Sequence, residues 1–143
     1  MSLIIIADDD ELVIDVVRAA LEARGHVVGS LGDGKGVRKV VELKRPDAVI
    51  LDCSMDDVSG VIALREIRAS VKVAATPVLM LTGRRSNMDE NIARVAGADD
   101  YLRKPFDPDE LVARIEVLID QSSQRFARRA SDGADVSASG ASH

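Results

Sequence analysis

Carboxylates follow two short apolar segments of this chain. Residues 3–7 lead directly into Asp8 and Asp9, and residues 48–51 lead directly into Asp52. Carboxylates that lie close together raise one another's pKa or require a cation between them. Hard oxygen ligands without histidine or cysteine suit Mg²⁺, which binds a few carboxylates together with water and phosphate oxygens. A carboxylate can also be the nucleophile that carries a phosphoryl group.

A hydroxyl and an ammonium group follow two further apolar segments. Thr82 ends the segment 78–82, and Lys104 follows the short segment 101–103. A hydroxyl donor, a lysine and Mg²⁺ are the groups that spread negative charge in the transition state of phosphoryl transfer. Each residue also has an ordinary interpretation when it stands alone: a helix start, a turn cap, a β-forming threonine or a surface lysine. Their occurrence in order, each at the end of an apolar segment, favours a phosphoryl-transfer site.

The apolar segments predict buried strands, and the stretches between them predict helices. Short apolar runs bounded by turn signals are typical of strands covered on both faces. We expect strands, each followed by an amphipathic helix, over residues 3–7, 26–29, 48–52, 78–82 and 101–103. Asp10 is expected to cap the first helix or to lie in its first turn, and Gly25 to end that helix as its C-terminal cap. Asp107 and Pro108 are expected to begin the last helix.

The alternation of strand and helix predicts the fold class. Five strand–helix units in succession indicate an α/β protein with a parallel sheet, right-handed crossovers and helices on both faces, which is a doubly wound architecture. The carboxyl ends of parallel strands share one edge of the sheet, and ligands bind at that edge. The residues expected to converge there are Asp8, Asp9, Asp52, Thr82 and Lys104.

Composition and charge argue against several other classes of protein. The 143 residues are enough for one domain, and 46% hydrophobic with 30% charged residues is an ordinary globular balance. The net charge of −5 argues against broad contact with a nucleic-acid backbone. The single cysteine excludes an intrachain disulfide, and no apolar run approaches the roughly 20 residues that span a bilayer. Without a recognisable signal peptide, we expect a cytoplasmic protein with no membrane contact.

The composition changes near residue 120. From Gln121 to His143 the chain is rich in serine, alanine, glycine and arginine, with Phe126 and Val136 as its large apolar residues. Such a segment buries too little surface to offset the entropy of ordering it. We therefore predict a domain over residues 1–120 and a mostly disordered tail over residues 121–143, allowing the last helix to run a turn or two into it.

Four stretches of the chain carry a family resemblance. They are residues 4–10, residues 49–52 with Ser59 and Gly60 behind them, residues 79–83 and residues 97–106. In these stretches, and from about Leu3 to Asp120, the chain resembles the receiver domain of two-component response regulators. The resemblance implies a flavodoxin-like (βα)5 sandwich with a five-stranded parallel sheet in the order 2-1-3-4-5. It also implies a phosphoacceptor switch that at most catalyses its own phosphorylation and dephosphorylation.

The resemblance implies a role for each acidic residue at the sheet edge. Asp52 matches the phosphoacceptor of the family. Asp8 and Asp9 match the acids that hold Mg²⁺, and Asp52 and the backbone carbonyl of Ser54 match its further ligands. The phosphoryl donor implied by the family is a sensor histidine kinase or a phosphotransfer protein.

The resemblance also implies how the chain responds. Thr82 matches the switch hydroxyl, Lys104 the lysine that pairs with the phosphoryl group, and Tyr101 the aromatic residue that moves with the threonine. The Lys104–Pro105 bond is expected to be cis, which is rare for peptide bonds in general. The altered surface is expected to comprise the fourth helix, the fifth strand and the fifth helix, and to contact a downstream protein or an output domain of the same chain.

One ion pair bears on a possible homodimer. Asp100 and Arg114 match a pair used for dimers by receivers that carry winged-helix DNA-binding domains, and Glu110 fits the same pattern. The receiver itself is not expected to contact nucleic acid directly.

Three alternatives stay open at this point. The chain is a single-domain regulator, or it is the receiver fragment of a longer DNA-binding or enzymatic regulator. A different class is a Mg²⁺-dependent phosphatase with an aspartate nucleophile, because Asp8 and Asp10 have the two-residue spacing that such enzymes use. A third class is an interaction module with a defunct pocket, but the complete set of acids, Thr82 and Lys104 argues against it.

Overall fold

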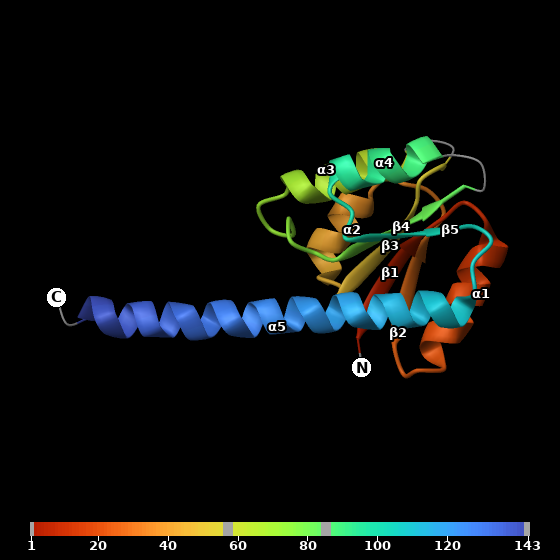
Figure 1. Cartoon of the computed structure of the whole chain (residues 1–143). Helices are drawn as coiled ribbons and strands as arrows, with labels where there is room; N and C mark the ends of the chain where they lie inside the picture. Colours follow the sequence, from red (N-terminus) through yellow and green to blue (C-terminus); the bar gives the residue numbers. More distant parts are fainter. Residues whose placement is uncertain (1, 56–58, 84–86, 142–143) are drawn as a thin grey trace.

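The computed structural model describes residues 2–55, 59–83 and 87–141 and shows strands alternating with helices (Figure 1). The elements in chain order are β1 (Leu3–Ala7), α1 (Glu11–Glu22), β2 (Val27–Leu31), α2 (Val37–Lys44), β3 (Ala48–Asp52), α3 (Gly60–Ala69), β4 (Val78–Thr82), α4 (Asn87–Ala96), β5 (Asp100–Arg103) and α5 (Pro108–Ala141). The strands form one parallel sheet in the order β2-β1-β3-β4-β5. The predicted doubly wound α/β fold with strand order 2-1-3-4-5 is confirmed.

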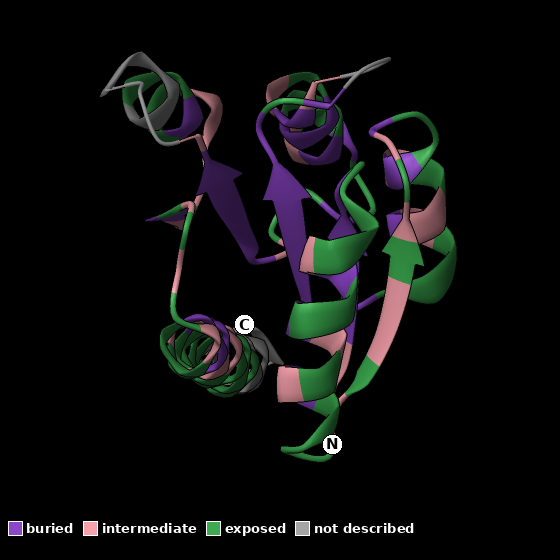
Figure 2. Cartoon of the chain, turned by 90° about the vertical axis from the view of Figure 1, so that its right-hand side faces the viewer, coloured by how far each residue is buried: buried purple, intermediate pink, exposed green. Residues whose placement is uncertain are grey.

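The sheet lies between two layers of helices. Helices α1 and α5 cover one face, and α2, α3 and α4 cover the other (Figures 1 and 2). Every residue of β3 and β4 is buried, whereas β2 lies at an edge and is partly exposed. Because side chains alternate along a strand, the sheet supplies two separate apolar clusters. Ile4 and Leu79 face α1 and α5, and Val49 and Met80 face the other layer.

Side-chain caps begin several of the helices. Asp10 Oδ1 accepts a hydrogen bond from the backbone N–H of Leu12 at 2.9 Å, which confirms Asp10 as the cap of α1. Asp107 precedes α5, and its Oδ1 accepts a hydrogen bond from the N–H of Asp109 at 2.9 Å. The start of the last helix was therefore predicted correctly.

The end of α1 agrees with the prediction that Gly25 closes the helix. The regular helix runs to Glu22, and Gly25 follows in the left-handed conformation with a φ of 87°. The N–H of Gly25 donates to the carbonyl of Glu22 at 2.9 Å, and the N–H of His26 donates to the carbonyl of Leu21 at 3.2 Å. These two bonds form a Schellman motif, in which glycine supplies the left-handed residue that satisfies the last carbonyls of the helix.

Helix α5 is longer than expected. It continues to Ala141, beyond the turn or two that were allowed past Asp120 (Figure 1). Alanine, arginine and glutamine favour helix, and propagating an existing helix costs less than nucleating one. The side chains at residues 123–131 are all exposed, so packing gives this part of the helix little support. The division at residue 120 and the mostly disordered tail over 121–143 stay predictions for the chain in solution.

A search of the described helices for membrane spans finds none with the length and apolar character needed to cross a bilayer.

Candidate functional site

Three carboxylates meet at the carboxyl edge of the sheet. Strands β1 and β3 are neighbours, and Ala7 lies opposite Leu51. Asp8 follows Ala7 and Asp52 follows Leu51, so these two acids lie side by side at the end of the sheet. One oxygen atom from each of Asp8, Asp9 and Asp52 lies within 4.8 Å of the other two. Asp8 and Asp52 are buried and Asp9 is exposed, so the cluster opens to solvent on one side.

Backbone hydrogen bonds orient the two buried carboxylates. Asp8 Oδ1 accepts a hydrogen bond from the N–H of Asp10 at 2.9 Å. Asp52 Oδ1 accepts one from the N–H of Ser54 at 3.2 Å. Each of these carboxylates thus has its Oδ1 engaged by its own loop, and its Oδ2 is directed to the lysine described next.

Lys104 brings an ammonium group to both buried carboxylates. Its Nζ lies 3.0 Å from Asp8 Oδ2 and 3.4 Å from Asp52 Oδ2. Its backbone N–H donates to the carbonyl of Thr82 at 2.8 Å, which extends the β4–β5 pairing by one residue. The Lys104–Pro105 peptide bond is cis, the isomer that the resemblance implies.

The environment shifts the pKa values of these groups. Burial and, second, the neighbouring charge of Asp8 raise the pKa of Asp52 to about 6, against the opposing effects of Ser54 and Lys104. For Lys104, partial burial disfavours the charged form, but hydrogen bonding to Asp8 and the charges of Asp52 and Asp8 outweigh it and raise the pKa of the ammonium. The lysine is therefore charged at neutral pH.

Thr82 supplies a buried hydroxyl close to the acidic cluster. It ends β4, next to β3, where Leu81 is the register partner of Asp52. Its side chain is fully buried, and its Oγ1 has no hydrogen-bond partner among the residues that the structure describes. A buried hydroxyl without a partner costs about 1–3 kcal/mol.

The donor set fits a hard divalent cation. Three carboxylates face one lysine, so negative charge remains in excess at the cluster. Carboxylate oxygens with no histidine or thiolate among the ligating atoms are the ligands that suit Mg²⁺. The cluster is therefore a candidate metal site.

Gly60 allows α3 to start directly against the site. A Cβ atom at this position would lie 2.0 Å from the carbonyl oxygen and 2.8 Å from the carbonyl carbon of Asp52. The backbone N–H of Gly60 donates to the carbonyl of Cys53 at 3.3 Å. The Ser59–Gly60 motif was noted in the sequence, but its purpose, the close approach of two backbones, is visible only in the fold.

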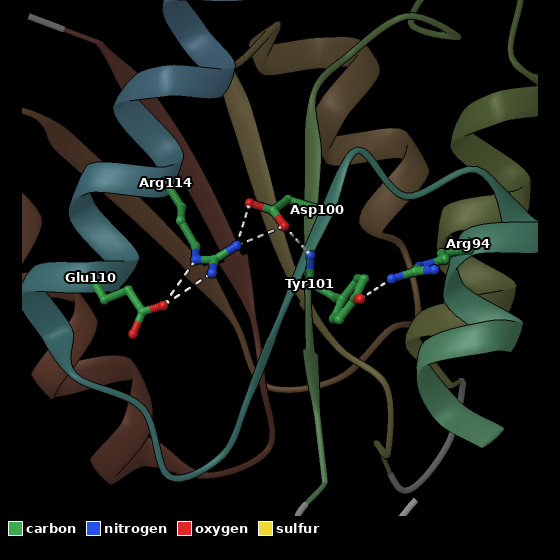
Figure 3. Close-up of polar contacts among 5 residues, drawn as sticks. All are labelled: Arg94, Asp100, Tyr101, Glu110 and Arg114. Atoms are coloured by element: carbon green, nitrogen blue, oxygen red, sulfur yellow. Dashed lines mark hydrogen bonds and ion pairs between the residues drawn. The ribbon is translucent and has the colours of Figure 1, made fainter. Parts of the chain in front are cut away.

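A second group of polar residues lies on both sides of β5 (Figure 3). Arg114 from α5 donates to both carboxylate oxygens of Asp100, at 3.0 and 3.1 Å, and also contacts Glu110 at 3.0 Å. Asp100 and Arg114, expected as a pair that serves a homodimer, thus contact each other within one chain, and the homodimer stays a prediction. On the other side of β5, Arg94 from α4 donates to the hydroxyl of Tyr101. Sequence reasoning missed Arg94, because an exposed helical arginine carries no signal of its partner on a strand.

The fold and the acidic edge define a doubly wound domain with a candidate metal site at its topological switch point. The sequence matches the family model described as the response regulator receiver domain over residues 4–116. The chain belongs to this family.

Several characterised proteins are similar to the chain in sequence. The DNA-binding response regulator MtrA of Mycolicibacterium smegmatis is 32% identical over 130 residues, covering 91% of this chain and 56% of MtrA. The transcriptional regulatory protein TrcR of Mycobacterium tuberculosis is 37% identical over 141 residues, covering 97% of this chain and 54% of TrcR. The regulator RpaA of Synechocystis is 39% identical over 120 residues, covering 83% and 49%. The chain therefore spans about half the length of these relatives.

Solved structures of receiver domains are similar to the chain in fold. The receiver domain of the sensor histidine kinase PA1611 from Pseudomonas aeruginosa is 31% identical with a TM-score of 0.77, covering 83% of this chain and 98% of that one. That structure is described as having a magnesium ion coordinated in the active-site cleft. The receiver domain of the Francisella response regulator 1452 is 27% identical with a TM-score of 0.78, covering 85% and 99%.

Proposed function

We propose that this receiver accepts a phosphoryl group on the carboxylate of Asp52 and signals through its α4–β5–α5 face. The observation that carries the proposal is the geometry around Asp52: a buried carboxylate lies beside two further acids and 3.4 Å from the ammonium of Lys104. The hydroxyl of Thr82, which has no hydrogen-bond partner among the described residues, is buried at the end of the adjacent strand.

In the reaction proposed, an oxygen of Asp52 attacks the phosphorus atom of a donor. The O–P bond to Asp52 forms as the bond from phosphorus to the donor breaks, and the donor leaves with the bonding electron pair. Asp52 is a nucleophile in its ionised form, and Lys104 stabilises the negative charge that builds up on the phosphoryl oxygens. The natural donor is proposed to be a histidine kinase or a phosphotransfer protein.

The metal proposed for the cluster is Mg²⁺. Asp8, Asp9 and Asp52 would hold it through their carboxylates, with the backbone carbonyl of Ser54 as a further ligand. When bound, Mg²⁺ supplies positive charge that offsets the repulsion between the acids and the incoming phosphoryl group. Lys104 keeps its place between Asp8 and Asp52 as the fixed positive charge of the protein.

The response proposed begins at Thr82 and Lys104. A phosphoryl group on Asp52 offers acceptors to Lys104 and to the hydroxyl of Thr82, for which the described part of the chain provides no partner. The gain biases an equilibrium between two arrangements of α4, β5 and α5. The partner of this face is proposed to be a downstream protein, an output domain in a longer chain, or a second copy that uses Asp100 and Arg114.

We propose that the receiver works in the cytoplasm, where kinase and target would both be reached.

The alternative of a phosphatase finds less support. Asp8 and Asp10 have the two-residue spacing of the acids in such enzymes, but Asp10 Oδ1 is engaged as the cap of α1. A general acid in such an enzyme would need that carboxyl group for the leaving group. Membership of the receiver family favours the phosphoacceptor switch.

The experiment that tests the proposal is intact mass spectrometry after incubation with Mg²⁺ and acetyl phosphate. Wild-type chain is expected to gain one phosphoryl group, and Asp52→Asn none. Asp15→Asn, an exposed acid on α1, is the matched control and should be modified like the wild type. A phosphoryl adduct on the Asp52→Asn variant, or none on wild type with any donor, would refute Asp52 as the acceptor.

A further inference from the structure

A groove runs beside α5 where this helix leaves the domain (Figure 1). One hollow of about 390 Å³ lies between α5 and the loops that precede β3 and β4. A second hollow of about 250 Å³ adjoins it and reaches Asp99, the residue before β5. The two share Ala75, Ser122 and Phe126, so they form one continuous groove, called here the base groove. It lies at the amino-terminal edge of the sheet, opposite the acidic cluster at the carboxyl edge.

Much of the lining of the base groove is apolar. The apolar residues come from the loops before β3 and β4 and from α5: Pro46, Val73, Ala75, Pro77, Ile119 and Phe126. Ile119 and Phe126 are seven residues apart, and Ser122 and Ser123 lie between them, so these four residues share one face of the helix. Phe126 is largely exposed to solvent. An exposed aromatic ring at the wall of an apolar hollow is suited to anchor the side chain of a partner.

The acidic residues that line the groove are engaged within the domain. Asp47 Oδ2 accepts a hydrogen bond from the N–H of Leu3 at 2.8 Å. Asp99 Oδ2 accepts from the N–H of Val78 and from the guanidinium of Arg68, both at 2.8 Å. Arg68 also donates to three backbone carbonyls of the surrounding loops. These side chains hold the loops together and are not free to bind a partner.

The arginines that line the groove from α5 are free, in contrast. Arg125 and Arg129 form no ion pair with any residue in the described ranges. Residues 121–131 contain three arginines and no acidic residue, although the whole chain has a net charge of −5. The α5 wall of the groove therefore places uncompensated positive charge beside an apolar surface.

This wall of the groove also lacks packing of its own. The side chains of residues 123–131 are exposed, and most helices in proteins are stabilised by packing of one face. A partner segment that entered the groove would cover Phe126 and supply that packing. A flat lipid surface would reach the outer side of the helix but not the recess between the helix and the domain, so the concave shape favours a peptide over a membrane.

We propose that the base groove binds an acidic peptide segment of a partner protein. An apolar side chain of that segment packs on Phe126 and Ile119, and its carboxylates pair with Arg125 and Arg129, whose planar guanidinium groups suit carboxylates. The groove is at the opposite edge of the sheet from Asp52. The proposal therefore goes beyond the phosphoacceptor switch and does not depend on phosphorylation.

Binding of a synthetic peptide to the full chain tests the proposal. The probe is a fluorescein-labelled peptide of about twelve residues, made of glutamate with two leucines four positions apart, and fluorescence anisotropy reports its binding. We expect the wild type to bind it, and Arg129→Gln and Phe126→Ala each to bind it about fivefold more weakly. A peptide with glutamine in place of every glutamate should bind about tenfold more weakly than the acidic one.

Arg128→Gln is the matched control for Arg129→Gln. The two arginines are neighbours on the same helix, and their replacement changes the net charge equally, but Arg128 lines neither hollow of the base groove. Its affinity for the acidic peptide should stay within about twofold of the wild type. All three side chains are exposed, so the variants are expected to fold, and thermal unfolding followed by circular dichroism verifies this.

The results either support or overturn the proposal. Weaker binding by Arg129→Gln and Phe126→Ala with unchanged binding by Arg128→Gln supports it. It is overturned if the wild type does not bind the acidic peptide, if both arginine variants lose affinity equally, or if the glutamine peptide binds as tightly. Binding to phosphatidylglycerol vesicles without binding to the peptide would also overturn it, and would assign the arginines to a membrane surface.

Discussion

Asp52 is held in a place where its negative charge is disfavoured. Burial and the neighbouring charge of Asp8 raise its pKa to about 6, so the native state binds this proton more tightly than the unfolded chain does. Ionising Asp52 therefore lowers the free energy of unfolding. The buried position of Asp52 thus costs stability, but it keeps a carboxylate at the site where a phosphoryl group and a cation are proposed to bind.

Replacing this charge should stabilise the metal-free chain. We expect Asp52→Asn to raise the free energy of unfolding by about 1–3 kcal/mol at pH 7.5, since one pKa unit corresponds to about 1.4 kcal/mol. The gain should be present above pH 6, decline as the pH falls from 6 to 4, and be absent below 4, where the wild-type carboxyl is protonated in both states. Urea denaturation in a chelating buffer measures it.

The control for this prediction is Asp15→Asn, which removes an exposed acid and should change the free energy of unfolding by less than about 0.5 kcal/mol. Added Mg²⁺ should stabilise the wild type by binding its native state, and so reduce the advantage of Asp52→Asn. An Asp52→Asn variant that is less stable than the wild type at pH 7.5 without metal would contradict the assigned direction of the pKa shift.

Residues at strand ends were predictable, and contacts between surface elements were not. Asp8, Asp52 and Thr82 each end an apolar run, and the topology of a parallel sheet is enough to bring such residues to one edge. Arg94 and Tyr101 lie on a helix and a strand whose relative rotation depends on packing. No local pattern in the sequence encodes that rotation, so their contact emerged only from the structure.

At the scale of elements, α3 is placed by a glycine. Gly60 is buried at the first position of the helix, and a Cβ there would lie 2.0 Å from the backbone oxygen of Asp52. Backbone atoms cannot move aside as the end of a flexible side chain can. The start of α3 and the end of β3 therefore share a fixed separation that a side chain at this position would break.

We expect Gly60→Ala to lower the free energy of unfolding by about 3 kcal/mol, at the upper end of the usual cost of overpacking. Gly32→Ala is the matched control, because a Cβ at Gly32 meets nothing within 4 Å. Equilibrium urea denaturation of both variants measures the difference. If the two alanine variants are equally stable, the close approach at Gly60 does not constrain α3.

Element order was easier to predict than element boundaries. All five strands and their helices were expected in the correct order, but β2 runs from Val27 to Leu31 and not over residues 26–29. An edge strand is covered on fewer sides, so its residues carry a weaker apolar pattern. The end of α1 was easier to predict, because the left-handed Gly25 closes the helix in a Schellman motif.

At the scale of the whole molecule, α5 combines two environments in one helix. Its first part packs on the sheet and α1 through Leu111, Ile115 and Leu118. Its later part carries Phe126, which is 76% exposed, and extends away from the sheet as a single rod (Figure 1). The core of the domain therefore owes little to the chain beyond residue 121.

Removing residues 122–143 should leave the domain intact. We expect the free energy of unfolding to change by less than about 0.5 kcal/mol, as is usual when exposed side chains are altered. Denaturation with urea tests this, and far-ultraviolet circular dichroism adds a second observation. The helical signal per residue falls on truncation if the segment is helical in solution, and rises if it is the disordered tail that the sequence predicted. A loss of more than 1 kcal/mol would show that the segment packs on the domain.

The two apolar clusters are separated by the sheet backbone, because alternate side chains of each strand enter one cluster or the other. One cluster supports α1 and α5, and the other supports α2, α3 and α4. Sequence drift can therefore repack one side without forcing compensating changes on the other. For protein engineering, the same partition means that one helical layer can be redesigned while the opposite layer, and the strands between them, keep their native residues.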